Sequence, residues 1–169
     1  MVSAIDAIRL RAAESPATTL RGLAGLLLPW ALAAYIAYIL LWYLPFKFYP
    51  DSYLFQVLED WVGLSWFEPY FRYFTGCVEG VTCLLLFVPG LQVAGAAVAF
   101  ATMGTAIFLH LASPLGVDPY HDGGVLFREA CTNLVFAAAI LVIRRHEILP
   151  LLQRLATDPR FAAFLRANT

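Results

Sequence analysis

Four long apolar stretches, separated by short polar segments, set the pattern of this chain. The first runs over residues 22–46 without a charged side chain. At 1.5 Å per helical residue it is long enough to cross a hydrocarbon layer of about 30 Å. Three more follow at about 70–88, 91–111 and 124–143. This pattern predicts an all-α fold, an integral membrane four-helix bundle made by residues 22–143.

The segments around these predicted spans are amphipathic or aromatic. Residues 1–21 and 144–169 each combine arginines with apolar residues at helical spacing, which predicts cytoplasmic amphipathic segments at both termini. Residues 46–74 hold 12 of the 25 aromatic side chains. Aromatic side chains favour the level of the lipid headgroups. This segment is therefore either an interfacial helix at about 51–62 or a plain loop outside the membrane.

Composition excludes several classes of protein. Hydrophobic residues make up 61% of the chain and charged residues only 14%, whereas soluble domains have about 25% charged residues. The net charge of −1 provides no field that would recruit nucleic acid. The three cysteines form no C-x-x-C pair and cannot build a disulfide framework. The composition indicates a protein whose environment is the lipid bilayer.

The basic residues predict an orientation in the membrane. Eight of the 11 Lys and Arg residues lie in the terminal segments, and the other three are Lys47, Arg72 and Arg128. Cytoplasmic segments carry an excess of Lys and Arg. We therefore expect a multi-pass protein with both termini in the cytoplasm, and with residues 46–70 and 112–123 on the outer side.

A few ionisable side chains fall inside or beside the predicted spans. Such residues are costly at membrane depth, by about 2.5–3.5 kcal/mol on insertion scales, and mark candidate sites. The clearest is Glu79, in the second span. The others are Lys47, Arg72, His110, Arg128, Glu129 and Asn133, all placed in the outer half of the membrane by the predicted topology. A helical bundle would turn them inward, which predicts a polar pocket that opens outward.

Each of these residues has a candidate role. Glu79, as the floor of the pocket, would exchange a proton with a bound molecule and is the candidate catalytic residue. The other six residues would bind the ligand, with Lys47 and Arg128 as counter-charges. Alternatively, Glu79 and a basic partner form a structural clamp between helices. His110 and His121 match no metal-binding spacing, so no metal site is predicted.

Three short motifs are similar to a known family. They are Leu-Pro-Phe-Lys-Phe at 44–48, Tyr-Phe-Thr-Gly-Cys-Val-Glu-Gly at 73–80 and Ala-Ile-Phe-Leu-His at 106–110. In this order, with a Pro-Gly turn between the last two, the chain resembles the DoxX-like family of small four-helix bacterial membrane proteins over about residues 25–143. The resemblance implies a location in the bacterial inner membrane and an association with quinone-linked redox chemistry.

Two functions are open at this point. The first is a membrane protein that binds a small, partly apolar, quinone-like molecule, as a subunit of a redox system. The second is a non-catalytic accessory or assembly subunit that docks a larger membrane complex, with the intramembrane polar residues structural. A small transporter is less favoured, because the sequence shows no internal repeat.

Overall fold

Helices form nearly all of the regular structure in this computed structural model, which describes residues 16–50 and 52–157. Within these ranges there is no strand, which confirms the all-α prediction. The segments predicted on residues 1–15 and 158–169 lie outside the described residues.

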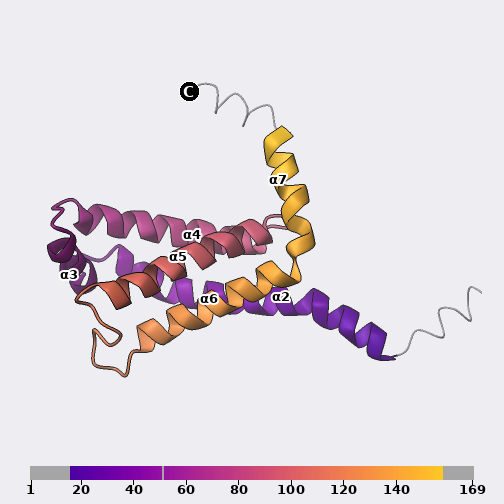
Figure 1. Cartoon of the computed structure of the whole chain (residues 1–169), viewed down its shortest axis with the longest axis horizontal. Helices are drawn as coiled ribbons and strands as arrows, with labels where there is room; N and C mark the ends of the chain where they lie inside the picture. The colour runs from indigo at the N-terminus through magenta and orange to yellow at the C-terminus, as the bar shows by residue number, and fades with distance from the viewer. Residues whose placement is uncertain (1–15, 51, 158–169) are drawn as a thin grey trace, which may run out of the picture.

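Four longer helices pack side by side (Figure 1). They are α2 (Pro16–Tyr43), α4 (Arg72–Phe87), α5 (Gln92–Ala112) and α6 (Val125–Ile143). Helix α2 contacts α4 and α6, and α5 contacts the same two helices. The α2–α6 pair therefore lies opposite the α4–α5 pair.

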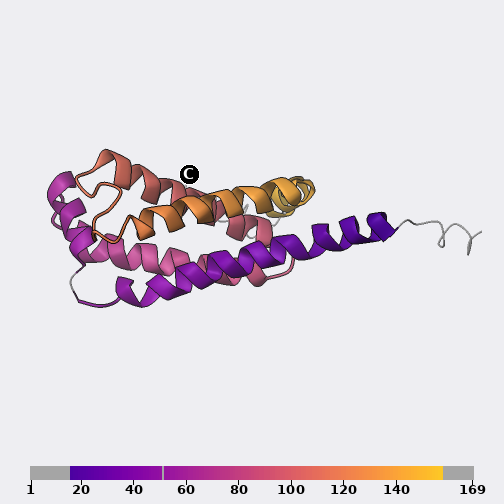
Figure 2. The same cartoon turned by 90° about the horizontal axis from the view of Figure 1, so that it is seen from below.

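Shorter elements occupy the two ends of this group. The short helices η1 (Leu44–Lys47), α3 (Tyr53–Val62) and η2 (Phe67–Phe71) follow one another between α2 and α4. At the other end, η3 (Arg145–Glu147) leads into α7 (Ile148–Thr157), which runs away from the long helices (Figures 1 and 2). Helix α3 thus lies where the sequence predicts a helix at about 51–62.

Three segments in the described ranges are long and apolar enough to cross a membrane: Gly25–Lys47, Gln92–Ala112 and Val125–Ile143. They correspond to three of the four predicted spans. The remaining predicted span contains α4. This helix has only 16 residues, whereas each of the three segments above has at least 19. The reason is local, because Glu68 has the extended angles φ −98° and ψ 126° within η2 and interrupts the helix before α4 begins.

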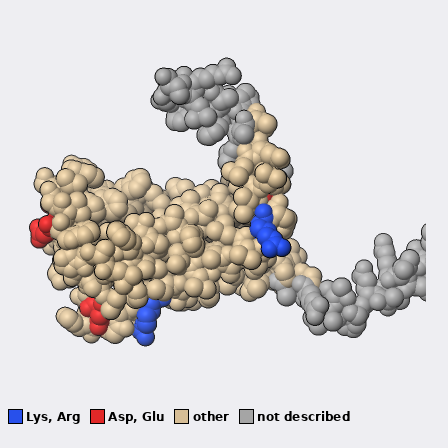
Figure 3. Space-filling view, in the orientation of Figure 1, with Lys and Arg blue, Asp and Glu red and all other residues tan. Residues whose placement is uncertain are grey.

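The charged side chains on the surface seen in Figure 3 are concentrated toward the two ends of the group of helices. The face in Figure 3 shows Lys, Arg, Asp and Glu side chains near the two ends and an uncharged surface between them. Many large apolar side chains are exposed along the helices, among them Leu27, Leu84, Phe108 and Val135. Such an apolar surface favours a lipid environment.

Small residues in the core let the long helices approach closely. Ala33, Ala96, Ala99 and Ala137 are fully buried. At Gly95, a Cβ atom would lie 2.7 Å from the backbone nitrogen of Leu86, so α4 and α5 are in backbone contact beside the turn that joins them.

The Gly76-x-x-x-Gly80 motif contributes through only one of its glycines. At Gly76, a Cβ atom would lie 2.9 Å from the Cβ atom of Lys47, so this position brings η1 against α4. At Gly80 nothing lies within 4 Å of that point. The motif is therefore a packing site at its first position and not at its second.

A second apolar cluster closes one end of the group of helices. It contains Phe55 and Leu58 of α3, Phe67 of η2 and Leu115 of the α5–α6 linker. The side chain of Leu109, near the end of α5, packs against it. Helix α3 and the linker therefore form a cap, held by its own small core.

Candidate functional site

A cavity of about 440 Å³ lies beneath the cap, between α3 and the four long helices. Its volume is within the range of about 300–1,000 Å³ that is typical of small-molecule sites. Most of its lining is apolar, with residues such as Leu40, Phe55, Phe71, Met103 and Leu126.

Five of the seven residues predicted to form a site line this cavity: Lys47, Glu79, His110, Glu129 and Asn133. They come from η1, α4, α5 and α6. Glu129 and Asn133 are four residues apart on one helix, so they lie on the same face. The structure thus brings these five side chains together. Their wall is more apolar than the polar pocket that the sequence suggests.

Glu79 and Lys47 form the charged part of the cavity. The Lys47 Nζ atom lies 3.6 Å from Glu79 Oε1 and 5.0 Å from the centre of the Phe55 ring. The second carboxylate oxygen, Oε2, is buried and has no hydrogen-bond partner among the described residues. Glu79 therefore has one carboxylate oxygen near a cation and one that accepts no hydrogen bond from the described residues.

Two side chains of α6 present further unused polar atoms. Asn133 is fully buried, and neither its amide nitrogen nor its amide oxygen has a partner in the described part of the chain. One buried oxygen of Glu129 is likewise unpartnered. The Tyr43 hydroxyl interacts with the Glu129 carboxyl group. Each buried polar atom left without a partner costs about 1–3 kcal/mol, which a suitable ligand would recover.

His110 is oriented by the cap. Its Nδ1 atom lies 2.7 Å from the carbonyl oxygen of Gly116, in the α5–α6 linker. A carbonyl can only accept, so Nδ1 carries the hydrogen and donates it. In the neutral ring, Nε2 is then left as an acceptor. The ring also packs edge-on against Phe127, with 5.7 Å between the ring centres.

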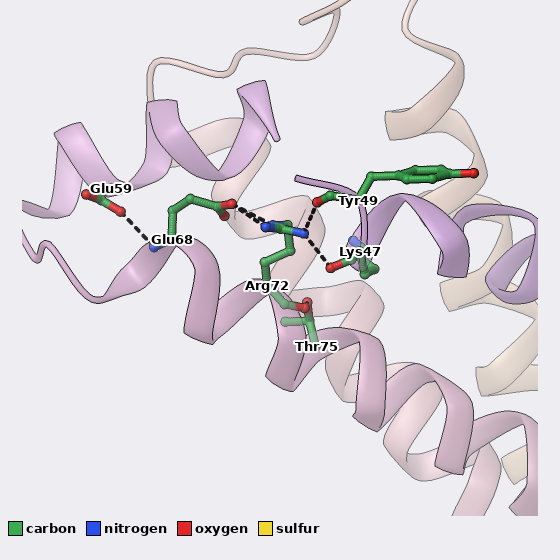
Figure 4. Close-up of polar contacts among 6 residues, drawn as sticks. All are labelled: Lys47, Tyr49, Glu59, Glu68, Arg72 and Thr75. Atoms are coloured by element: carbon green, nitrogen blue, oxygen red, sulfur yellow. Dashed lines mark hydrogen bonds and ion pairs between the residues drawn. The ribbon is translucent and has the colours of Figure 1, made fainter. Parts of the chain in front are cut away.

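Arg72 lies outside the cavity lining, and the structure gives it another role (Figure 4). Its guanidinium donates to Glu68 Oε1 at 2.7 Å, and to the carbonyl oxygens of Lys47 and Tyr49, each at 2.6 Å. Glu59 in turn accepts from the backbone N–H of Glu68 at 2.7 Å. Arg72 is 1% exposed. It ties α4 to the segment after η1 and has its donors directed at the protein.

Arg128 is also absent from the cavity lining. It is exposed at the start of α6, where its backbone N–H donates to the carbonyl oxygen of Gly124, and its side chain makes no hydrogen bond or ion pair within residues 16–50 and 52–157. Only Lys47 of the two expected counter-charges therefore approaches Glu79. Nor do three or more His, Cys, Asp or Glu side chains in the described ranges come together in a way that could hold a metal ion.

Tyr43 is a lining residue that sequence reasoning missed. Its place near the end of a span made it resemble any interfacial aromatic residue. A usable signal was its spacing, because Tyr43 precedes Lys47 by four residues and helical neighbours at that spacing share a face.

The cavity suits one kind of molecule in particular. Lys47 and the Asn133 amide group offer donors, while Glu79, Glu129 and His110 offer acceptors, all on an apolar wall. Such a site fits a molecule that has carbonyl or hydroxyl groups on an apolar frame. The chain matches no known protein family, no characterised protein and no solved structure.

Proposed function

We propose that this chain is a DoxX-like membrane protein that binds a quinone-like molecule in the cavity beneath the cap, as the membrane subunit of a redox system. Glu79 exchanges a proton with a hydroxyl or carbonyl oxygen of the ligand. Lys47, His110, Glu129 and Asn133 orient the polar edge of the ring. The apolar lining residues pack against the two faces of this ring.

One observation carries this proposal. Unpartnered buried polar atoms of Glu79, Glu129 and Asn133 surround a single cavity that is otherwise apolar. Native structures rarely leave such atoms unused. A ring with hydroxyl groups at its edge, as in the reduced quinol form, donates to the carboxyl and amide oxygens and accepts from the Asn133 amide nitrogen without placing a net charge in the cavity.

The proposal includes a placement in the inner membrane as a four-span bundle. Helices α2, α5 and α6 are three spans, and α4 together with η2 is the fourth. The excess of Lys and Arg in the terminal segments supports a cytoplasmic location for both termini. The cap and the cavity then lie at the outer side, and α3 lies at the interface.

A second function is favoured by a different observation. The Lys47–Glu79 distance of 3.6 Å is also that of a structural ion pair between η1 and α4. If this pair only fixes the packing, the chain is an accessory subunit that docks a larger complex. In that case the cavity has no ligand.

Binding of decylubiquinone to the purified full chain in lipid nanodiscs separates the two functions. We expect the unmodified chain to bind decylubiquinone and its reduced quinol form. Asn133→Leu should weaken binding of both by about tenfold or more, because it removes the amide group, and Glu129→Gln should weaken binding of the quinol to a similar extent, because it replaces an acceptor of the quinol hydroxyl by a donor. Arg128→Gln is the matched control, since Arg128 neighbours Glu129 but lies outside the cavity.

Glu79→Gln adds a test of proton exchange. This variant should still bind decylubiquinone but should show a smaller pH dependence of binding, because its amide group does not titrate while Glu129 and His110 of the same cavity are unchanged. If the unmodified chain binds no quinone, or if all four variants bind equally well, the quinone proposal fails. Co-purification of a stoichiometric protein partner would then support the accessory function.

A further inference from the structure

The cavity has exposed lining on only one side. Of its lining residues in the described part of the chain, Phe74 of α4 and Ala101 and Thr105 of α5 are exposed. Phe74 is 62% exposed. The lining residues of α2, α3 and α6 are buried or half-buried. The cavity therefore opens sideways, between α4 and α5.

The packing of α4 and α5 explains this opening. The two helices are in backbone contact at Gly95, beside the turn that joins them. From there they diverge toward the α3 end in both views (Figures 1 and 2). Among the described residues, no side chain bridges the separation at the level of Phe74 and Thr105 closely enough to cover either residue.

The end of the group of helices offers no comparable route. Phe55, Leu58 and Leu115 of the cap line the cavity and are all buried. They belong to one apolar cluster. Entry through the cap would have to disrupt this cluster.

The side opening is apolar in character. The hydroxyl group of Thr105 donates to the carbonyl oxygen of Ala101, and that of Thr102 to the carbonyl oxygens of Val98 and Ala99. These hydroxyls therefore offer no free hydrogen to a ligand. Phe108, one turn after Thr105, is also exposed. The opening thus suits a hydrocarbon chain.

Three polar side chains of the cavity lie on the wall opposite the opening, while Glu79 belongs to α4 and His110 to α5. Tyr43 belongs to α2, and Glu129 and Asn133 belong to α6. The α2–α6 pair is opposite the α4–α5 pair. A polar head against Asn133 would consequently place any attached tail toward the side opening.

We propose that the ligand is an amphiphile with a single long apolar tail, which enters between α4 and α5 and leaves its tail in that opening while its head binds near Asn133. The inference rests on the proposed function and narrows its ligand to a tailed, membrane-dissolved molecule. In a bilayer, the opening faces the hydrocarbon layer.

The test compares two probes on the full chain in lipid nanodiscs. One is decylubiquinone, and the other is the same dimethoxy-methyl-benzoquinone ring without its tail. Ala101→Trp places a bulky side chain at the exposed opening, and Val135→Trp places the same side chain at an exposed position of α6 that does not line the cavity. Both sites are exposed, so both variants are expected to fold.

We expect Ala101→Trp to weaken equilibrium binding of decylubiquinone by about tenfold or more and to leave equilibrium binding of the tail-less ring within about twofold, since in the bound state only the tail occupies the opening. Val135→Trp should bind both probes like the unmodified chain. Equal losses for both probes in Ala101→Trp, or no loss for either, would overturn the inference.

The unmodified chain separates this inference from the proposed function. If it binds the tail-less ring as tightly as decylubiquinone, the tail has no place in the structure and only the inference fails. If it binds neither probe, the proposed function fails and the inference fails with it.

Discussion

The α4–α5 pair differs sharply between its two ends. Beside the turn at Pro89–Gly90, Gly95 brings the two backbones together, and the buried amide group of Gln92 donates to the carbonyl oxygen of Leu86 at 3.2 Å. Toward α3 the same helices separate around a cavity, where both atoms of the Asn133 amide group are unpartnered.

This difference separates buried polar groups that are hydrogen-bonded within the described residues from those that are not. The buried Gln92 at the packed end uses its amide nitrogen within the chain, although its amide oxygen has no partner among the described residues. Several buried polar atoms at the α3 end likewise lack a partner within residues 16–50 and 52–157, although the cap around them is well held by Arg72. The α3 end therefore combines a hydrogen-bonded frame with buried polar atoms that have no partner among the described residues, and stability and binding should respond differently to substitution there.

The largest expected effect is the loss of the frame itself. Arg72→Met leaves Glu68 and the carbonyl oxygens of Lys47 and Tyr49 without their donor, and removing one partner of a buried ion pair costs about 3–5 kcal/mol. Thermal unfolding in detergent should show a large fall in the midpoint temperature. Arg128→Met is the control and should unfold like the unmodified chain. Equal stability of the two variants would refute the role of Arg72 as a clamp.

The next effect concerns the packed end. Gly95→Ala places a Cβ atom against the backbone of Leu86, and overpacking of this kind costs about 1–3 kcal/mol. Gly80→Ala, on α4, has open space around it and should instead stabilise its helix by about 0.5–1 kcal/mol. Unfolding midpoints of the two variants should therefore shift in opposite directions. Shifts in the same direction would contradict the close approach at Gly95.

At the α3 end, stability and binding should change in opposite directions. Asn133→Leu removes two buried polar atoms that have no partner and should stabilise the ligand-free chain by about 1–3 kcal/mol, while it weakens quinone binding. Gln92→Leu removes an amide group whose nitrogen is hydrogen-bonded and whose oxygen is unpartnered among the described residues, so it should stabilise the chain less than Asn133→Leu does. Unfolding without added ligand and a binding titration measure the two effects. A destabilised Asn133→Leu variant would indicate that the amide group is structural.

The smallest effect is expected in the α5–α6 linker. Slight burial alone would raise the pKa of Asp118, but hydrogen bonds from the backbone N–H groups of Gly124, Asp122 and Gly123 lower this pKa below its usual value. Because its pKa is lower in the folded state, Asp118 contributes stability above its unfolded pKa of about 3.9, and this is lost as pH falls through the folded value. Unfolding midpoints between about pH 6 and pH 3 should fall less steeply in Asp118→Asn. Parallel curves would mean that these hydrogen bonds contribute nothing to stability.

Much of this fold could be predicted from the sequence because apolar stretches and turn residues act locally. The predicted spans at 91–111 and 124–143 differ by one residue at most from the ends of α5 and α6. The meeting of Glu79, His110 and Asn133 could also be predicted, since an ionisable or amide side chain in an apolar helix turns away from lipid.

Other features depend on contacts that sequence patterns do not encode. Arg72 was expected to bind a ligand, but it binds carbonyl groups more than 20 residues earlier in the chain. Neither the interruption at Glu68 nor the divergence of α4 and α5 has a periodic signature. The side opening follows from that divergence and could be seen only in three dimensions.

The unequal lengths of the helices have a consequence for the membrane itself. Helix α2 has 28 residues, or about 42 Å, whereas α4 has 16 residues, or about 24 Å. Around a hydrocarbon layer of about 30 Å, a long helix tilts or extends into the headgroups, and a short one draws the two leaflets together. In the proposed placement, where only the interrupted η2 extends α4, the bilayer should therefore be thinnest beside α4, on the side where the cavity opens. Exchange of a lipid-soluble ligand should accordingly respond to acyl-chain length, being faster in short-chain nanodiscs than in long-chain ones.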